Sequence, residues 1–157
     1  MADFEVRGGQ KLRQITAELN RMGDGHQVRT RFSRELRATA RPMVADVRAS
    51  IMAIPTHGSK HTGLRARMAA ATSLHVNVSA RGAAVWVIVD GRKMPPGQGS
   101  LPAYMEGSKP RWQHPVYGVG VVTQASHPYF APVVRRYGPK TRRAVYDVVD
   151  GISDDIT

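Results

Sequence analysis

Cysteine is absent from this chain, and aromatic residues are scarce. With no cysteine among its 157 residues, the chain has neither a disulfide nor a thiolate nucleophile. Aromatic residues make up only 6% of the composition, so valine, alanine, leucine, isoleucine and methionine must supply most of the core volume. No apolar run approaches the roughly 18–20 residues of a membrane span, and the first residues lack the apolar stretch of a secretory signal. The composition therefore predicts a soluble, non-exported chain without a membrane partner.

The motifs of the common catalytic sites are also missing. The sequence contains no GxxxxGKS or GxxxxGKT phosphate loop, no GxGxxG after a strand, and neither HExxH nor GxSxG. His57 and His61 have a His-x-x-x-His spacing, but the glycine and serine between them disfavour the helix that would bring both rings to a metal. His114 and His127 each precede a proline, which indicates a role in shaping the backbone. We therefore predict that the protein is not an enzyme and needs no cofactor or metal.

Positive charge is the dominant chemical feature that remains. The chain carries 23 lysines and arginines against 12 acidic residues, for a formal net charge of +11. Such a charge attracts polyanions and speeds encounter with them. Arginine outnumbers lysine, and arginine is also preferred in contacts between proteins. The charge therefore leaves two kinds of partner open, which are DNA and the acidic surface of a neighbouring protein.

Apolar residues recur at helical spacing over the N-terminal third of the chain. One stripe, within residues 8–22, is followed by a Gly-Asp-Gly sequence that is typical of a helix end. A longer stripe ends before Pro55, and Pro42 inside it is expected to kink or divide that helix. Helices are therefore predicted within residues 8–54. The stripes consist of Leu12, Ile15, Leu19, Met22, Val28, Phe32, Leu36, Ala40, Met43, Val47, Ile51 and Ile54.

The pattern changes from a helical period to strict alternation after residue 71. Thr72, Leu74, Val76 and Val78 alternate with polar residues, as in a half-buried strand. A turn over 80–82 separates this strand from an apolar strand over 84–89, so residues 71–90 are predicted to form an antiparallel hairpin. The second strand is apolar on both faces, and we expect helices or other subunits to cover it.

The segment from Arg92 to Lys109 is rich in proline and glycine and has no clear period. A long irregular segment within a compact domain is usually functional or disordered. It is expected to order either as a lid over a ligand or as an arm that reaches a neighbouring subunit. The arm is preferred because no catalytic set accompanies the segment. Residues expected to contact a neighbour, here and just beyond, are Met94, Leu101, Tyr104, Met105, Tyr117 and Val121.

The stretch from Pro110 to Phe130 holds much of the aromatic content and both His-Pro pairs. Residues 116–122 are predicted to form a short strand in which glycines allow a bend. We interpret the stretch as an extended arm or edge strand that feeds a final helix over 128–153, kinked at Gly138-Pro139. Stacking of nucleobases on its aromatic rings beside Arg111 is an alternative to their role as core or interface anchors.

Together these patterns predict an α+β fold in a single domain over residues 1–157. A small antiparallel sheet packs against N-terminal helices and a kinked C-terminal helix, with a long irregular arm-like loop. The predicted parts are a helical region over 8–54, a hairpin over 71–90, an extended loop or arm over 91–127, and a C-terminal helix over 128–153.

The order of the motifs resembles that of a family of phage proteins. HTGLR stands at 61–65, PRWQHPVYG at 110–118, a spacer with Thr123-Gln124 follows, and HPYFAPVVRR stands at 127–136. From about residue 28 onward, the chain resembles the small neck, or tail-completion, proteins of long-tailed siphophages. This family includes head–tail joining proteins and minor tail components. Val121 and Val122 stand where the resemblance leads us to expect a tryptophan.

The resemblance implies a structural protein of the virion that has no enzymatic activity and no cofactor. Such a protein assembles in the host cytoplasm into an oligomeric ring at the head–tail junction, where it joins the head connector to the tail. The implied partners are further copies of the chain, the connector or stopper, the tail terminator or tail tube, and DNA in the channel. A basic DNA-binding protein of phage or bacterial origin is the alternative. The structural signature comprises Arg111, Trp112, His114, Pro115, Gly118, His127, Pro128 and Phe130.

Overall fold

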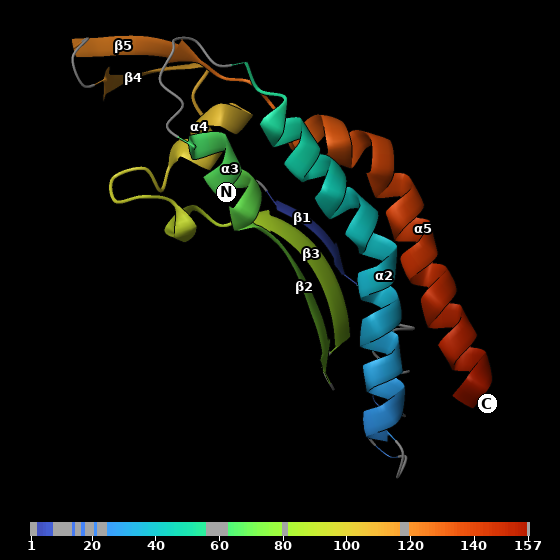
Figure 1. The fold of residues 1–157 in the computed structure, drawn as a ribbon. Coiled ribbons are helices and arrows are strands. Elements are labelled where there is room, and N and C mark those ends of the chain that lie inside the picture. Colours follow the sequence, from blue (N-terminus) through green and yellow to red (C-terminus); the bar gives the residue numbers. More distant parts are fainter. Residues whose placement is uncertain are drawn as a thin grey trace.

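The computed structural model describes residues 3–7, 14, 17, 21, 25–55, 63–79, 82–116 and 120–156. Its helices and strands make an α+β fold, as the sequence predicts, with two antiparallel sheets (Figure 1). The elements are β1 (Asp3–Arg7), α2 (Gly25–Met52), α3 (Leu64–Ala71), β2 (Thr72–Ser79), β3 (Gly82–Val89), the 3-10 turn η1 (Gly91–Lys93), α4 (Leu101–Glu106), β4 (Arg111–Val116), β5 (Gly120–Ala125) and α5 (Ala131–Ile156).

The larger sheet has three strands in the order β1-β3-β2. The predicted hairpin is confirmed, because β2 and β3 pair antiparallel from Thr72 opposite Val89 to Ser79 opposite Gly82. On one face, Val85, Val87 and Val89 of β3 are buried against the helical layer. The alternate residues of β3 lie on the other face, where Trp86 stacks on His75 with ring centroids 6.0 Å apart. Strand β1 was not predicted, and its pairing with β3 extends the hairpin to three strands.

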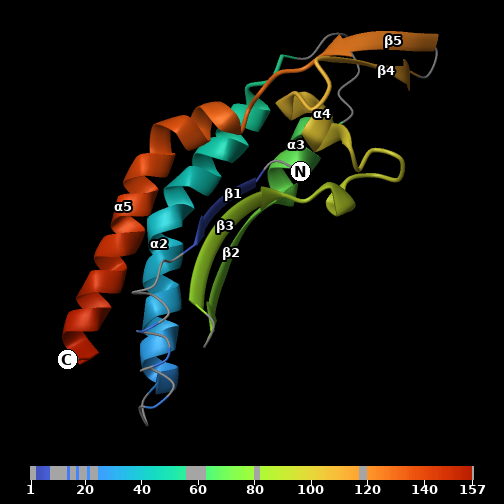
Figure 2. The ribbon, with the colours of Figure 1, turned by 180° about the vertical axis from the view of Figure 1, so that it is seen from behind.

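Helices α2 and α5 lie side by side and cover one face of this sheet (Figures 1 and 2). The predicted apolar stripe of α2 is buried from Phe32 to Ile51. Pro42 lies within α2 without dividing it, so the expected split is absent. The stripe continues into the same core on both sides of the proline, and this burial holds both parts of the helix together.

Helix α5 runs alongside α2 and bends in its N-terminal half, where Pro139 lies (Figure 1). The predicted kinked C-terminal helix is therefore confirmed, although it begins at Ala131 instead of residue 128 and ends at Ile156. The Arg136 guanidinium joins the two helices by an ion pair with Asp46, at 2.6 Å. Hydrogen bonding to Tyr137, supported by the charge of Arg136, lowers the pKa of Asp46.

The long irregular loop expected over 91–127 is corrected, because most of this segment is folded. It contains η1, α4 and the hairpin of β4 and β5. The turn at η1 brings the backbones of Gly91 and Gly99 together, so closely that a side chain at Gly91 would collide with the Gly99 carbonyl oxygen. Gly107, with φ of 112°, ends α4 in the left-handed conformation. These short elements have too few residues to show a period in the sequence.

Among the described residues, the second sheet consists of β4 and β5, paired antiparallel from Arg111 opposite Ala125 to Val116 opposite Gly120. A single strand was expected over 116–122; of these residues, Val116 instead ends β4 and 120–122 begin β5, while 117–119 lie outside the described residues. The β4–β5 hairpin projects from one end of the body (Figures 1 and 2). The segment that projects is therefore the β4–β5 hairpin, and α4, within the 92–109 segment, contacts its base.

Some expectations concern parts of the chain outside the described residues. Most of the helix expected over 8–22 is among them, although Gln14 and Ala17 are helical. The paired histidines 57 and 61 also lie outside the described residues, as do Tyr117 and Gly118.

Candidate partner-binding surface

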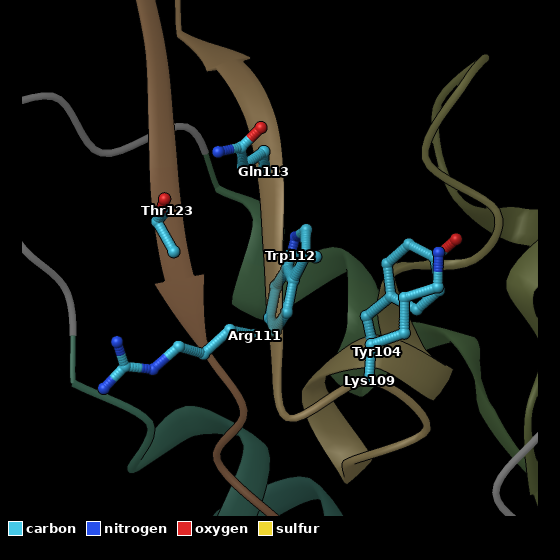
Figure 3. A pocket seen from close by; sticks show the side chains of 6 residues that line it. All are labelled: Tyr104, Lys109, Arg111, Trp112, Gln113 and Thr123. Carbon is cyan, nitrogen blue, oxygen red and sulfur yellow. The ribbon is translucent and has the colours of Figure 1, made fainter.

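Trp112 anchors the base of the β4–β5 hairpin on α4. Its side chain is only 7% exposed, and its ring lies 5.8 Å from that of Tyr104 on α4. Figure 3 shows Trp112 pointing from β4 toward Tyr104. Two polar contacts support the same junction, because the Gln124 amide lies 3.5 Å from the Met105 sulfur and the His127 amide donates to the Met105 carbonyl at 2.9 Å. The hairpin is therefore held to the body at its base.

Glu106, the last residue of α4, fastens this base to the start of α5. One carboxylate oxygen accepts from the amides of Tyr129 and Phe130, at 3.0 and 2.8 Å, and the other accepts from the amide of Ala131, at 2.8 Å. Amides at a helix start have no partner within the helix, and the local dipole favours a negative charge there. Glu106 thus caps α5 from another element.

Tyr129 provides a second link between these segments. Its side chain is 1% exposed, and its hydroxyl donates to the Pro102 carbonyl oxygen at 3.1 Å. Burial, together with the nearby charge of Glu106, raises the pKa of the Tyr129 hydroxyl. The phenol therefore stays protonated, and can keep donating, to a higher pH than an exposed tyrosine would.

The predicted signature residues divide into buried anchors and exposed positions. Trp112 and Phe130 are buried, whereas Arg111, His127 and Pro128 are exposed. The remaining signature residues are His114 and Pro115, which lie on β4 with undescribed side chains, and Gly118, which lies outside the described residues. The two motifs therefore meet at the α4 junction, through Trp112 on one side and Tyr129-Phe130 on the other. Sequence reasoning missed Glu106, whose only local signal is its place as a lone acid in a neutral and basic segment.

The residues expected to contact a neighbour are also of two kinds, buried and exposed. Met94 and Met105 are buried in the core of the chain, and Leu101 and Tyr104 are half-buried against it. These four side chains are therefore not presented as a separate arm, and two of them, Tyr104 and Met105, contact the hairpin and the residues that follow it. Val121 on β5 is 66% exposed, as an interface residue requires.

An open cavity of about 470 Å³ lies between α4 and the hairpin. It is lined by Tyr104, Lys109, Arg111, Trp112, Gln113 and Thr123 (Figure 3). The Lys109 ammonium lies 4.9 Å from the centroid of the Tyr104 ring and so covers one of its faces. Trp112 is buried, so its ring is not available to stack on a nucleobase. Among the described residues that line it, none is a carboxylate or an imidazole, the usual groups of acid–base chemistry, and Lys109 and Arg111 are its two cations.

The outer face of the hairpin is exposed along both strands. Arg111 and Gln113 of β4 lie opposite Ala125 and Thr123 of β5, and all four residues are exposed. Val121 continues the same face toward the tip. This face carries one charged side chain, Arg111, among polar and apolar ones.

Asp90 holds the loop that leads to α4. Its carboxylate accepts from the Arg92 backbone amide at 3.0 Å and from the Arg92 guanidinium at 2.9 and 3.0 Å. These hydrogen bonds from Arg92 lower the pKa of Asp90.

Within the described ranges, histidines and carboxylates form no group of three that could hold a metal ion. Among the described helices, none has the length and apolar character needed to cross a membrane.

Comparison with known proteins leaves the chain without an assigned family. No model of a protein family matches it, and no curated protein and no solved structure shows significant similarity to it. The resemblance to phage neck proteins therefore stays a prediction from the sequence motifs.

Proposed function

We propose that this chain is a structural protein of the phage head–tail junction. In this proposal it assembles as a ring that joins the head connector to the tail, and it performs no catalysis. The observation that carries the proposal is the projecting β4–β5 hairpin, whose base is fastened by Trp112 and Glu106 while its outer face is exposed. A fixed base with an accessible arm suits a subunit that must hold a neighbour in one orientation.

The resemblance of the motifs adds independent support to this proposal. The segments that carry it, PRWQHPVYG and HPYFAPVVRR, are the segments that form the hairpin, its junction with α4 and the start of α5. In this proposal, the two motifs preserve the geometry of the arm relative to the helices. The partners are further copies of the chain, the head connector or stopper, and the tail terminator or tube.

The alternative function, a basic DNA-binding protein, is favoured by one specific feature. Arg34, Arg37 and Arg41 are exposed on α2 at spacings of three and four, so they share one side of the helix. Such a stripe can contact successive phosphates of DNA. In a neck protein, the same stripe would face DNA in the channel or an acidic neighbour.

Deletion of the gene from the phage genome distinguishes the two functions. A neck protein is required to join heads and tails, so its loss is expected to leave DNA-filled heads and free tails that accumulate separately in the lysate. Complementation with the intact chain is expected to restore joined particles. Normal, infectious particles in the deletion strain would contradict the proposal. Binding of the purified chain to DNA that weakens steeply with salt would then favour the alternative.

A further inference from the structure

The two sheets that the described residues form have four outer strand edges. The larger sheet ends in β1 and β2, and the smaller sheet is bounded by β4 and β5. An open edge presents unpaired amides and carbonyls that can pair with another chain, and proteins commonly protect such edges with charged residues or proline. The four edges of this chain differ in that protection.

The hairpin has one protected edge and one unprotected edge. The Ser126 amide donates to the Pro110 carbonyl at 3.1 Å, so residues 110 and 126 form a hydrogen-bonded pair. Hydrogen-bonded and non-hydrogen-bonded pairs alternate from there along the two strands. It follows that the backbone groups at 111, 113 and 115 of β4 point outward, and so do those at 121, 123 and 125 of β5. On β4, Arg111 supplies a charge and Pro115 has no amide proton to offer. The outward positions of β5 are Val121, Thr123 and Ala125, with neither charge nor proline.

The larger sheet shows the same contrast. The Asp90 amide donates to the Ala71 carbonyl at 3.1 Å, so the backbone groups of Thr72, Leu74, Val76 and Val78 point away from β3. The Thr72 carbonyl accepts from the Arg48 guanidinium at 2.8 Å, which agrees with this direction. The whole of β2, TSLHVNVS, contains no proline, lysine, arginine or acid.

Strand β1, in contrast, is protected. Three of its five residues, Asp3, Glu5 and Arg7, are charged. Among the described residues, the open edge of β5 and that of β2 beyond Thr72, whose carbonyl already accepts from Arg48, are therefore the two that carry neither charge nor proline, and they belong to different sheets.

We propose that the β5 edge of one copy pairs with the β2 edge of a neighbouring copy. Main-chain hydrogen bonds then join the two sheets into one five-stranded sheet, β1-β3-β2 from one copy and β5-β4 from the next. The occupant of each edge is a second copy of this chain. The inference rests on the proposed function, since it specifies the contact by which the ring would form.

The geometry of the chain supports pairing between different copies. The hairpin projects from the body, so β5 is accessible to a neighbour (Figures 1 and 2). A two-stranded sheet is marginally stable in water, and addition to a three-stranded sheet would stabilise it. Because the two edges are different surfaces, the contact is heterologous and repeats from copy to copy, as a ring requires.

Proline substitutions on the two hairpin strands test this pairing with a matched control. Thr123→Pro removes an outward amide of β5 and leaves the bonds between β4 and β5 intact. Gln113→Pro makes the same change directly opposite, on the outward edge of β4. By sedimentation velocity at several protein concentrations, Thr123→Pro is expected to weaken self-association at least about tenfold. Gln113→Pro is expected to match the unsubstituted chain.

Lysine substitutions at the same two positions provide a second pair that does not constrain the backbone. Thr123→Lys places a charge on the β5 edge, and Gln113→Lys places one on the β4 edge. Circular dichroism establishes that each variant is folded before it is compared. A chain that stays monomeric at all concentrations, or equal effects of the β4 and β5 substitutions, would overturn the proposal.

Crosslinking identifies the two edges directly, because the chain has no cysteine of its own. A variant with both Thr123→Cys and Asn77→Cys, treated with a short bis-maleimide, is expected to give a ladder of covalent multimers. Each single variant is expected to remain uncrosslinked. A covalent dimer from Thr123→Cys alone would show that β5 pairs with itself, which would overturn the proposal.

The outcomes separate this inference from the proposed function. If deletion shows that head–tail joining needs the chain, but the double-cysteine variant gives no ladder when it is crosslinked in assembled particles, the pairing alone is overturned. A ladder from a chain that the phage does not need for joining would support the pairing and overturn the function.

Discussion

Loss of the Glu106 carboxylate should destabilise the protein more than its half-buried position suggests. Glu106 accepts three backbone amides at 2.8–3.0 Å from the start of α5. A hydrogen bond to a charged group contributes about 1.5–3 kcal/mol, and loss of a helix cap costs about 0.5–2 kcal/mol. Water can reach part of this half-buried site, so the three bonds do not add fully. Glu106→Ala is therefore expected to lower the free energy of unfolding by about 2–4 kcal/mol.

Urea denaturation of three variants measures this effect. Glu106→Gln keeps one acceptor oxygen and loses the charge, so it should fall between the original chain and Glu106→Ala. Glu35→Ala is the matched control, since Glu35 forms an exposed pair with Arg31 four residues earlier, at 2.9 Å. Such a pair contributes about 0.5 kcal/mol or less. If Glu106→Ala destabilised the chain no more than Glu35→Ala does, the hydrogen bonds of Glu106 would not hold the start of α5, and the reasoning would be refuted.

Three further predictions concern the core, the loop and the acid range. Trp112→Ala should lower the free energy of unfolding by about 3–5 kcal/mol, measured by urea denaturation, because it empties the junction of the hairpin with α4. Gly91→Ala should destabilise the chain by about 1–3 kcal/mol through collision with a backbone carbonyl, whereas Gly151→Ala, in open space on α5, should stabilise it by up to about 1 kcal/mol. The pKa of Asp46 is lowered in the folded chain from its ordinary 3.8, so its contribution is present above about pH 4 and is lost as the pH falls through the folded pKa. Melting temperatures from pH 6 to pH 2 should therefore fall less for Asp46→Asn than for the original chain.

The parts of the fold that were predicted are those with a long local pattern. The stripe of α2 repeats over many turns, and the alternation of β2 continues over eight residues. Both patterns reflect burial against a single layer, which periodicity detects directly. The hairpin of β2 and β3 also needs only a short turn to form.

The parts that were missed depend on contacts between distant residues. Strand β1 has five residues and pairs with β3 about eighty positions later, so no local pattern indicates it. Helix α4 is a six-residue helix between prolines and glycines. The bonds of Glu106 join residues 23–25 positions apart, and only the folded chain brings them together.

The candidate surface was located in part for the same reason. The stretch from 110 to 130 stood out by its aromatic residues and His-Pro pairs, and it forms the hairpin and the lead-in to α5. Its division into two paired strands was missed because the apolar run over 116–122 has the composition of one strand. Met94 and Met105 were expected at a surface, but both are buried in the core. The burial of a short segment depends on which distant elements pack over it, and the local sequence does not show that.

The central claim, that the chain is a structural protein of the head–tail junction, is tested most directly by its position in the particle. Electron microscopy of the phage, with gold-labelled antibody against this chain, measures that position. The account predicts label confined to the junction of head and tail. Particles without label at the junction, prepared under conditions in which the antibody binds the purified chain, would contradict it.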